Sequence, residues 1–127
     1  MMPYEKLDAW KLCHELVLEV WRATDKWTGA DAESLRDEIR SVALLAPARL
    51  ANGAGRRLQK PFQRMVDLAL GYLAELGYLL EQAEQVGLLT PGRRRGLDGL
   101  RGRAVFYTTK LFTSLASNPE TGPSTDS

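Results

Sequence analysis

Apolar side chains recur every three or four residues along most of this chain, and no stretch alternates apolar and polar residues as a half-buried strand would. This spacing is typical of amphipathic helices. Turn residues near positions 28–31, 53–55 and 87–90 divide the pattern into four segments. We therefore predict an all-α fold, an antiparallel up-down four-helix bundle with short connections.

The ends of the four predicted helices are marked by turn and capping residues. The first helix should end near residues 24–28, and the second should run to Gly53 with a kink at Pro47, because proline removes one backbone hydrogen bond. The third should span about 60–86, and the fourth should begin at Thr90 and Pro91, as N-cap and first helical residue. The predicted core stripes of the four helices are Leu7, Trp10, His14, Val17, Trp21 and Thr24; Leu35, Ile39, Val42, Ala46 and Leu50; Phe62, Met65, Ala69, Tyr72, Leu76, Leu79, Ala83 and Val86; and Leu97, Leu100, Ala104, Tyr107, Leu111 and Leu115.

The middle of the third predicted helix, residues 68–80, is apolar nearly all round. Such a helix is buried on more than one side. In a domain of four helices the second side is expected at a subunit interface, to which we assign Leu73, Leu80 and Tyr72; a fully central helix is the alternative. The sequence thus predicts a homo-oligomer.

The length of 127 residues suits one domain, and we predict a bundle over 1–116 followed by a disordered tail over 117–127, which is rich in Ser, Pro, Thr and Gly. Cys13 is the only cysteine, so no disulfide can form within the chain. The first six residues lack the apolar segment of a secretory signal, and the run 68–80 is too short to span a bilayer. We expect a cytoplasmic protein with no membrane association.

The net charge of +1 hides a strong segregation of charge along the chain. Residues 39–66 contain six basic residues and no carboxylate, and residues 93–110 contain six basic residues and one carboxylate. The segments that precede these two, 1–38 and 67–92, are acidic. This segregation favours an anionic partner or self-association. Alternatively, the charged helix faces neutralise one another within the bundle.

The fourth predicted helix has two unusual features near its start. Arg93, Arg94 and Arg95 occupy the first turn, where the helix dipole disfavours cations. Glycines recur along one side, at positions 92, 96, 99 and 102, although each weakens a helix. Either a neighbouring backbone approaches closely there, or the start of the helix is frayed.

Residues that could support catalysis are nearly absent. His14, the only histidine, lies on the predicted core stripe, and the adjacent Cys13 points about 100° away from it on a helix, so the two do not form a nucleophile–base pair. The sequence contains no metal-ligand cluster and no nucleotide-binding fingerprint. We predict a non-enzymatic protein without cofactor or metal.

The remaining candidate is a surface that binds nucleic acid through its phosphates. The glycine turn 52–57 places free helix-terminal amides beside guanidinium groups, and twelve of the seventeen basic residues are arginine, which suits bidentate phosphate contact. No pattern of aromatic residues interleaves the basic ones, so base stacking is not indicated. The predicted nucleic-acid-binding residues are Arg49, Arg56, Arg57, Lys60, Arg64, Arg93, Arg94 and Arg95.

Several short motifs occur in a characteristic order between residues 4 and 86. They are Tyr4-Glu5-Lys6-Leu7 with Trp10, His14-Glu15-Leu16, the approach from Leu35 to Arg40, Pro47-Ala48 with Leu50-Ala51 and Gly53, Gly55-Arg56-Arg57, Phe62 with Arg64, and Ala69-Leu70-Gly71 with Leu73 and Glu75-Leu76. This order resembles the four-helix-bundle proteins encoded in intervening sequences of bacterial 23S ribosomal RNA genes. The resemblance implies a small cytoplasmic bundle that forms a homopentamer. It also implies a relation to the accessory variability determinant of diversity-generating retroelements, which binds a reverse transcriptase and nucleic acid.

The chain departs from the family pattern at three positions. Arg49 stands where the family usually has Asn, Asn52 where it has Glu, and Gly77 where it has Glu. These changes remove two carboxylates and add a cation. They put family roles that depend on those acids in doubt and favour binding of an anion.

Three hypotheses of function follow. We favour a non-enzymatic oligomeric bundle that binds RNA or DNA through a basic surface. The alternative is an accessory subunit that binds a protein partner, such as a retroelement reverse transcriptase. The third is a helical-bundle enzyme that acts on an anionic small molecule held by Arg49 and Arg56.

Overall fold

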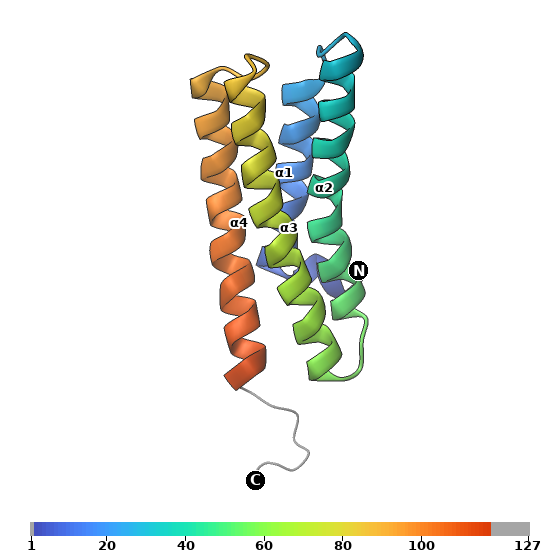
Figure 1. Cartoon of the computed structure of the whole chain (residues 1–127). Helices are drawn as coiled ribbons and strands as arrows, with labels where there is room; N and C mark the ends of the chain where they lie inside the picture. Colours follow the sequence, from blue (N-terminus) through green and yellow to red (C-terminus); the bar gives the residue numbers. More distant parts are fainter. Residues whose placement is uncertain (1, 118–127) are drawn as a thin grey trace.

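The computed structural model describes residues 2–117, and these form a short 3-10 helix followed by four long α-helices (Figure 1). The elements are η1 (Pro3–Lys6), α1 (Asp8–Thr24), α2 (Ala30–Ala54), α3 (Gln59–Gln85) and α4 (Pro91–Ser117). Each long helix runs antiparallel to the next, and α4 closes the bundle by packing on both α3 and α1. The predicted all-α, antiparallel up-down four-helix bundle is confirmed. Of the predicted tail 117–127, Ser117 ends α4 and the other residues lie outside the described part of the chain.

The core is built from aliphatic side chains of all four long helices. The largest fully buried apolar side chains come from α1, α2 and α3, and α4 adds Leu97 and Ala104. Each such leucine, isoleucine or valine stabilises the fold by about 1.5–3 kcal/mol relative to an exposed position. These side chains are Leu16, Val20, Ile39, Leu50, Val66, Leu73, Leu76 and Leu80.

The core stripe of α1 differs from the prediction by a rotation of about one residue. Ala9, Leu12, Cys13, Leu16, Val17 and Val20 are buried, together with Thr24 at the end of the helix. Trp10 and Trp21 lie half-buried at the margins of the core, and His14 is exposed. The prediction of a core position for His14 was therefore wrong. The aliphatic side chains fit between the neighbouring helices, whereas the larger rings lie at the edge of the contact.

The subunit interface assigned to α3 must also be corrected. Leu73 and Leu80 are only 1% and 0% exposed within the single subunit, so neither side chain can reach a second copy. Tyr72 is half-buried. The apolar side chains that α3 presents to solvent are instead Leu68 and Tyr78, which are 41% and 61% exposed.

The helix containing Pro47 is continuous. Pro47 is buried, and α2 extends past it for two further turns to Ala54. The structure thus places proline inside the helix, while the predicted kink at this position stays a prediction. Within residues 2–117, no helix is long and apolar enough to cross a membrane.

Glycine allows close packing at two places in the bundle. A Cβ atom on Gly53 would lie 2.7 Å from Phe62 Cδ1 and 2.9 Å from Met65 Cβ, so a larger residue would push α2 away from α3. A Cβ atom on Gly77 would lie 2.6 Å from Cζ of Arg101, whose guanidinium crosses from α4. Gly53 is thus required by the Cβ and backbone atoms of α3, whereas at Gly77 the flexible end of Arg101 can move aside.

The glycines of α4 lie in a different environment. A Cβ atom built on Gly96, Gly99 or Gly102 would project into open space. Apart from the adjacent residues and backbone of α4 itself, no atom of the described residues would lie within 4 Å of it. The helix is regular from Pro91 onward. Neither of the two explanations that we considered, close approach of a neighbouring backbone or a frayed start, holds for these three glycines within the subunit.

We predict that Gly53→Ala destabilises the bundle, whereas Gly99→Ala stabilises it. The first substitution forces a methyl group into the contact between α2 and α3 and should lower the free energy of unfolding by about 1–3 kcal/mol. The second adds a methyl group in open space and should raise it by up to about 1 kcal/mol, because alanine favours the helix. Urea unfolding followed by circular dichroism measures both. Equal effects of the two substitutions would contradict the close approach at Gly53.

Candidate nucleic-acid interface

Five predicted site residues lie around the turn that joins α2 to α3, at one end of the bundle (Figure 1). We call this group the basic end. It comprises Arg49, Arg56, Arg57, Lys60 and Arg64. Four of these residues are exposed, and Arg49 is half-buried.

The first turn of α3 lies within the basic end. Its N-cap residue, Leu58, provides no side-chain hydrogen bond, and the turn contains no acidic residue. The first amides of a helix have no partner within the helix and carry partial positive charge. Lys60 and Arg64 extend from the same turns, so their charged side chains and the positive end of the helix dipole reinforce one region of positive potential.

The basic end contains few carboxylates. Among the described residues, none of its five members forms an ion pair. Arg56 donates a hydrogen bond from Nε to Oδ1 of Asn52 at 2.9 Å, a neutral contact that orients the guanidinium and leaves its charge uncompensated. Lys60 and Arg64 border a shallow depression of about 270 Å³, where Asp67 is the one carboxylate.

Arg49 and Tyr72 were assigned to different predicted sites, but the structure brings them together. The Arg49 guanidinium lies 5.8 Å from the centroid of the Tyr72 ring and so links α2 to α3. A cation held over an aromatic face keeps its charge and loses freedom of movement. Arg49 is thus a fixed member of the basic end, and Tyr72 helps to position it.

The second group of predicted site residues lies at the opposite end of the bundle (Figure 1). The 27 residues of α3 separate the two ends by roughly 40 Å. Arg93 and Arg95 are exposed, and Thr90 caps α4 by accepting a hydrogen bond from the Arg93 amide at 3.1 Å. The two basic blocks therefore do not form a single positive face.

Arg94 is engaged in an ion-pair network between α3 and α4. Its guanidinium contacts Glu84 and lies 2.7 Å from Oδ2 of Asp98, and the hydrogen bond to Glu84 raises the pKa of Arg94. Asp98 also accepts a hydrogen bond from Arg101, which donates to the Leu73 carbonyl at 3.1 Å. Arg94 is thus paired within the subunit, and its assignment to phosphate binding is not supported. The network also explains how α4 tolerates a cation in its first turn.

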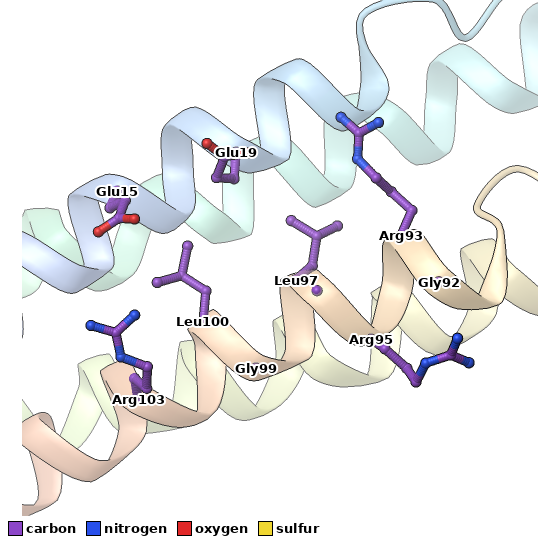
Figure 2. A pocket seen from close by; sticks show the side chains of 10 residues that line it. Glu15, Glu19, Gly92, Arg93, Arg95, Leu97, Gly99, Leu100 and Arg103 are labelled. Carbon is purple, nitrogen blue, oxygen red and sulfur yellow. The ribbon is translucent and has the colours of Figure 1, made fainter.

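A groove of about 530 Å³ runs between α1 and α4 at this second end (Figure 2). Arg93 and Arg103 extend from α4 toward α1, whereas Glu15 and Glu19 line the opposite wall. Phosphates in this groove would meet carboxylates across from the arginines. The basic end, with its lower content of acid, is therefore the stronger candidate for a polyanion.

The structure places the potential catalytic residues apart from one another. Cys13 is fully buried, and burial raises the pKa of its thiol to about 12. The Thr108 hydroxyl beside it offsets only part of this shift and makes no hydrogen bond of ordinary geometry within the described residues. His14 is exposed on another side of α1, and residues 2–117 contain no group of three His, Cys, Asp or Glu that could hold a metal.

Our sequence reasoning missed an aromatic cluster on the surface of α1 and η1. Trp10 stacks on His14 and also contacts Tyr4. The spacing of Trp10 and His14, four residues apart on a helix, indicates neighbouring side chains. That signal was read as a core stripe, because apolar periodicity alone does not distinguish the core from its margin.

Comparison with known proteins gives one result on the family of this chain. A family model described as 23S rRNA-intervening sequence protein matches residues 5–99. The matched region contains α1, α2, α3 and the first turns of α4, and with them the whole basic end. No curated protein matches the chain.

We predict that ionisation of Cys13 lowers stability in alkali. Between pH 9, the ordinary pKa of the thiol, and about pH 12, the unfolded chain loses the proton that the native state retains. The free energy of unfolding should therefore fall as pH rises above 9, by about 1 kcal/mol near pH 10. Urea unfolding at about pH 8 and pH 10 should show this additional loss in the wild type and not in Cys13→Ala. The same pH dependence in both proteins would contradict it.

Proposed function

Because the chain belongs to the 23S rRNA-intervening sequence protein family, we propose that it is a non-enzymatic oligomeric bundle that binds RNA through its basic end. The family description favours RNA over DNA as the first ligand to test.

The observation that carries this proposal is the group of cations without carboxylate partners around the first turn of α3. Arg56, Arg57, Lys60 and Arg64 are exposed, and none has a carboxylate partner among the described residues. Cations of this kind gain free energy by replacing the counterions of a phosphate backbone. The positive end of the α3 dipole adds to the attraction for phosphate oxygens. The resulting contacts would position RNA without reading its sequence.

We also propose that the protein self-associates through the exposed apolar side of α3. Leu68 and Tyr78 lie on this side with the exposed small residues Gly71 and Ala74, and the exposed carboxylates Asp67 and Glu75 border them. Small residues allow a second helix to approach closely, while the two larger side chains supply apolar area. The resemblance to the family implies five subunits. A ring would display several basic ends, so that one RNA could be held at more than one point.

A protein partner is the second candidate function, and the groove between α1 and α4 favours it. One wall is basic and the other is acidic (Figure 2). Mixed charge of this kind suits a protein surface better than a polyanion. A retroelement reverse transcriptase is the partner that the family relation suggests. A complex with it that survives nuclease treatment would distinguish this role from RNA binding.

We predict that replacing Arg56 and Arg57 together by Ala weakens RNA binding and leaves the helical content unchanged. The slope of log affinity against log salt should decrease in magnitude by up to about two, because two phosphate contacts are lost. Titration of structured RNA at several salt concentrations, followed by fluorescence anisotropy, measures the effect.

The matched control is the double variant Arg93→Ala with Arg95→Ala, which removes the same charge at the opposite end of the bundle. It should change affinity and salt slope less than the first variant. Binding that does not depend on salt, or no binding at low salt, would overturn the proposed function. Equal losses in both variants would refute the placement of the site at the basic end.

We predict that Leu68→Asp combined with Tyr78→Asp yields folded monomers. Two further carboxylates beside Asp67 and Glu75 would replace the apolar contact area with like charge and would repel a second copy without entering the core. By contrast, Leu73→Asp should unfold the subunit, at a cost of at least about 4 kcal/mol, because an unpaired charge would be buried. Light scattering and circular dichroism distinguish the two outcomes. An unchanged assembly of the first variant would exclude this side of α3 as the interface.

A further inference from the structure

Three aromatic side chains form a ladder on the outer surface of η1 and α1. The rings of Trp10 and His14 are stacked almost parallel, with centroids 4.9 Å apart and an angle of 6° between their planes. Tyr4 contacts Trp10 from the other direction, at 4.7 Å and an angle of 58°. Tyr4 and Trp10 are half-buried, whereas His14 is exposed. The half-buried rings of Tyr4 and Trp10 thus form the inner part of the ladder, and the solvent-exposed ring of His14 forms its outer end.

The His14 ring is exposed to solvent beyond its stack on Trp10, and the next residue along this face, Leu18, is itself 42% exposed. Trp10 covers one side of this ring, and His14 makes no hydrogen bond or ion pair with another described residue. Trp10 itself packs against the hydrophobic core, so it holds the stack in a fixed position. A planar group that stacks on His14 would extend an ordered pair of rings, with little further loss of side-chain freedom.

The other exposed aromatic residues lack this arrangement. Phe106 and Tyr107 meet edge to face, and the Lys110 ammonium lies 5.5 Å and 5.7 Å from their ring centroids. Their own cation thus already contacts these rings. Tyr78 is exposed on α3 without a stacked neighbour among the described residues. His14 and Trp10 differ from these residues because their rings stack almost parallel and the outer ring, that of His14, is exposed.

The ladder lies in the same half of the bundle as the basic end. The first turns of α1 and the last turns of α2 are side by side in the antiparallel fold, and η1 packs against both helices (Figure 1). Axes of neighbouring helices in a bundle are roughly 8–10 Å apart. Arg56 and Arg57 follow the last turn of α2, which is the neighbour of α1, so a single strand of a few nucleotides that contacts these two cations could also reach α1.

We propose that the exposed ring of His14, supported by Trp10, stacks on an unpaired base of single-stranded RNA whose phosphates contact the basic end. This inference rests on the proposed function and adds the form of RNA that is preferred. Proteins that bind single strands combine a cationic surface with aromatic rings on which bases stack, without regard to sequence. A base within a duplex is already stacked on both sides and cannot use the His14 ring.

The test compares two ligands that carry the same phosphates. One is a short oligouridine, and the other is an abasic oligoribonucleotide of the same length, which has no base to stack. The wild type should bind the oligouridine roughly fivefold to tenfold more tightly than the abasic strand. His14→Ala should lose most of this preference, while its affinity for the abasic strand should remain close to that of the wild type.

Two further variants separate stacking from other effects. His14→Phe keeps an aromatic ring at the same place and should retain the preference for the strand with bases. Phe106→Ala removes an exposed aromatic ring from α4 and should also leave the preference unchanged. Circular dichroism and light scattering confirm that all variants keep the fold and assembly of the wild type.

The outcomes distinguish this inference from the function on which it rests. If the wild type binds both strands equally, with an affinity that falls as salt rises, stacking is refuted and phosphate binding stands. If His14→Phe loses the preference, or Phe106→Ala loses it and His14→Ala does not, the His14 ring is not the platform. If the wild type binds neither strand nor structured RNA at low salt, both proposals fail.

Discussion

The close contact between α2 and α3 is the interaction on which the rest of the structure depends. These two helices supply most of the large aliphatic side chains of the core, and the missing side chain of Gly53 lets Phe62 and Met65 approach the α2 backbone. The same contact brings the last turns of α2 beside the first turns of α3. Cations that are spread over residues 49–64 thereby gather at one end of the bundle. Packing of apolar groups thus creates the electrostatic feature of this protein.

The antiparallel topology determines which charges can act together. Residues near the turn between α2 and α3 form one group, while those at the start of α4 lie a full helix length away. Carboxylates of Glu84 and Asp98 neutralise Arg94, and Arg101 completes a network that joins α4 to α3. Segregation of charge along the sequence therefore becomes one end with cations that lack carboxylate partners, bordered by Glu5 and Asp8, and a second end of mixed charge. The two ends suit different kinds of partner.

Gly77 illustrates how one residue can serve this arrangement. Glycine at this position leaves room for the Arg101 guanidinium over α3, where it hydrogen-bonds to the Leu73 carbonyl and to Asp98. A side chain at position 77 would occupy the same space. The space at Gly77 is thus filled by an arginine from α4, and the sequence offers no hint of this contact because 24 residues separate the two positions.

The sequence by itself determined the number of helices, their approximate ends, and the presence of a basic segment without carboxylates. These properties depend on local periodicity, capping and composition, so Thr90 and the glycines at 53 and 55 could be read directly. Only the tertiary structure decided that Leu73 and Leu80 lie in the core, that Arg94 is paired, and that His14 faces solvent on Trp10. The physical reason is that apolar periodicity shows that a helix has an apolar side, but it does not fix the rotation of the helix about its own axis to within one residue. Neighbouring helices fix that rotation by the fit of their side chains, and a rotation of about 100° exchanges a core position for a surface one.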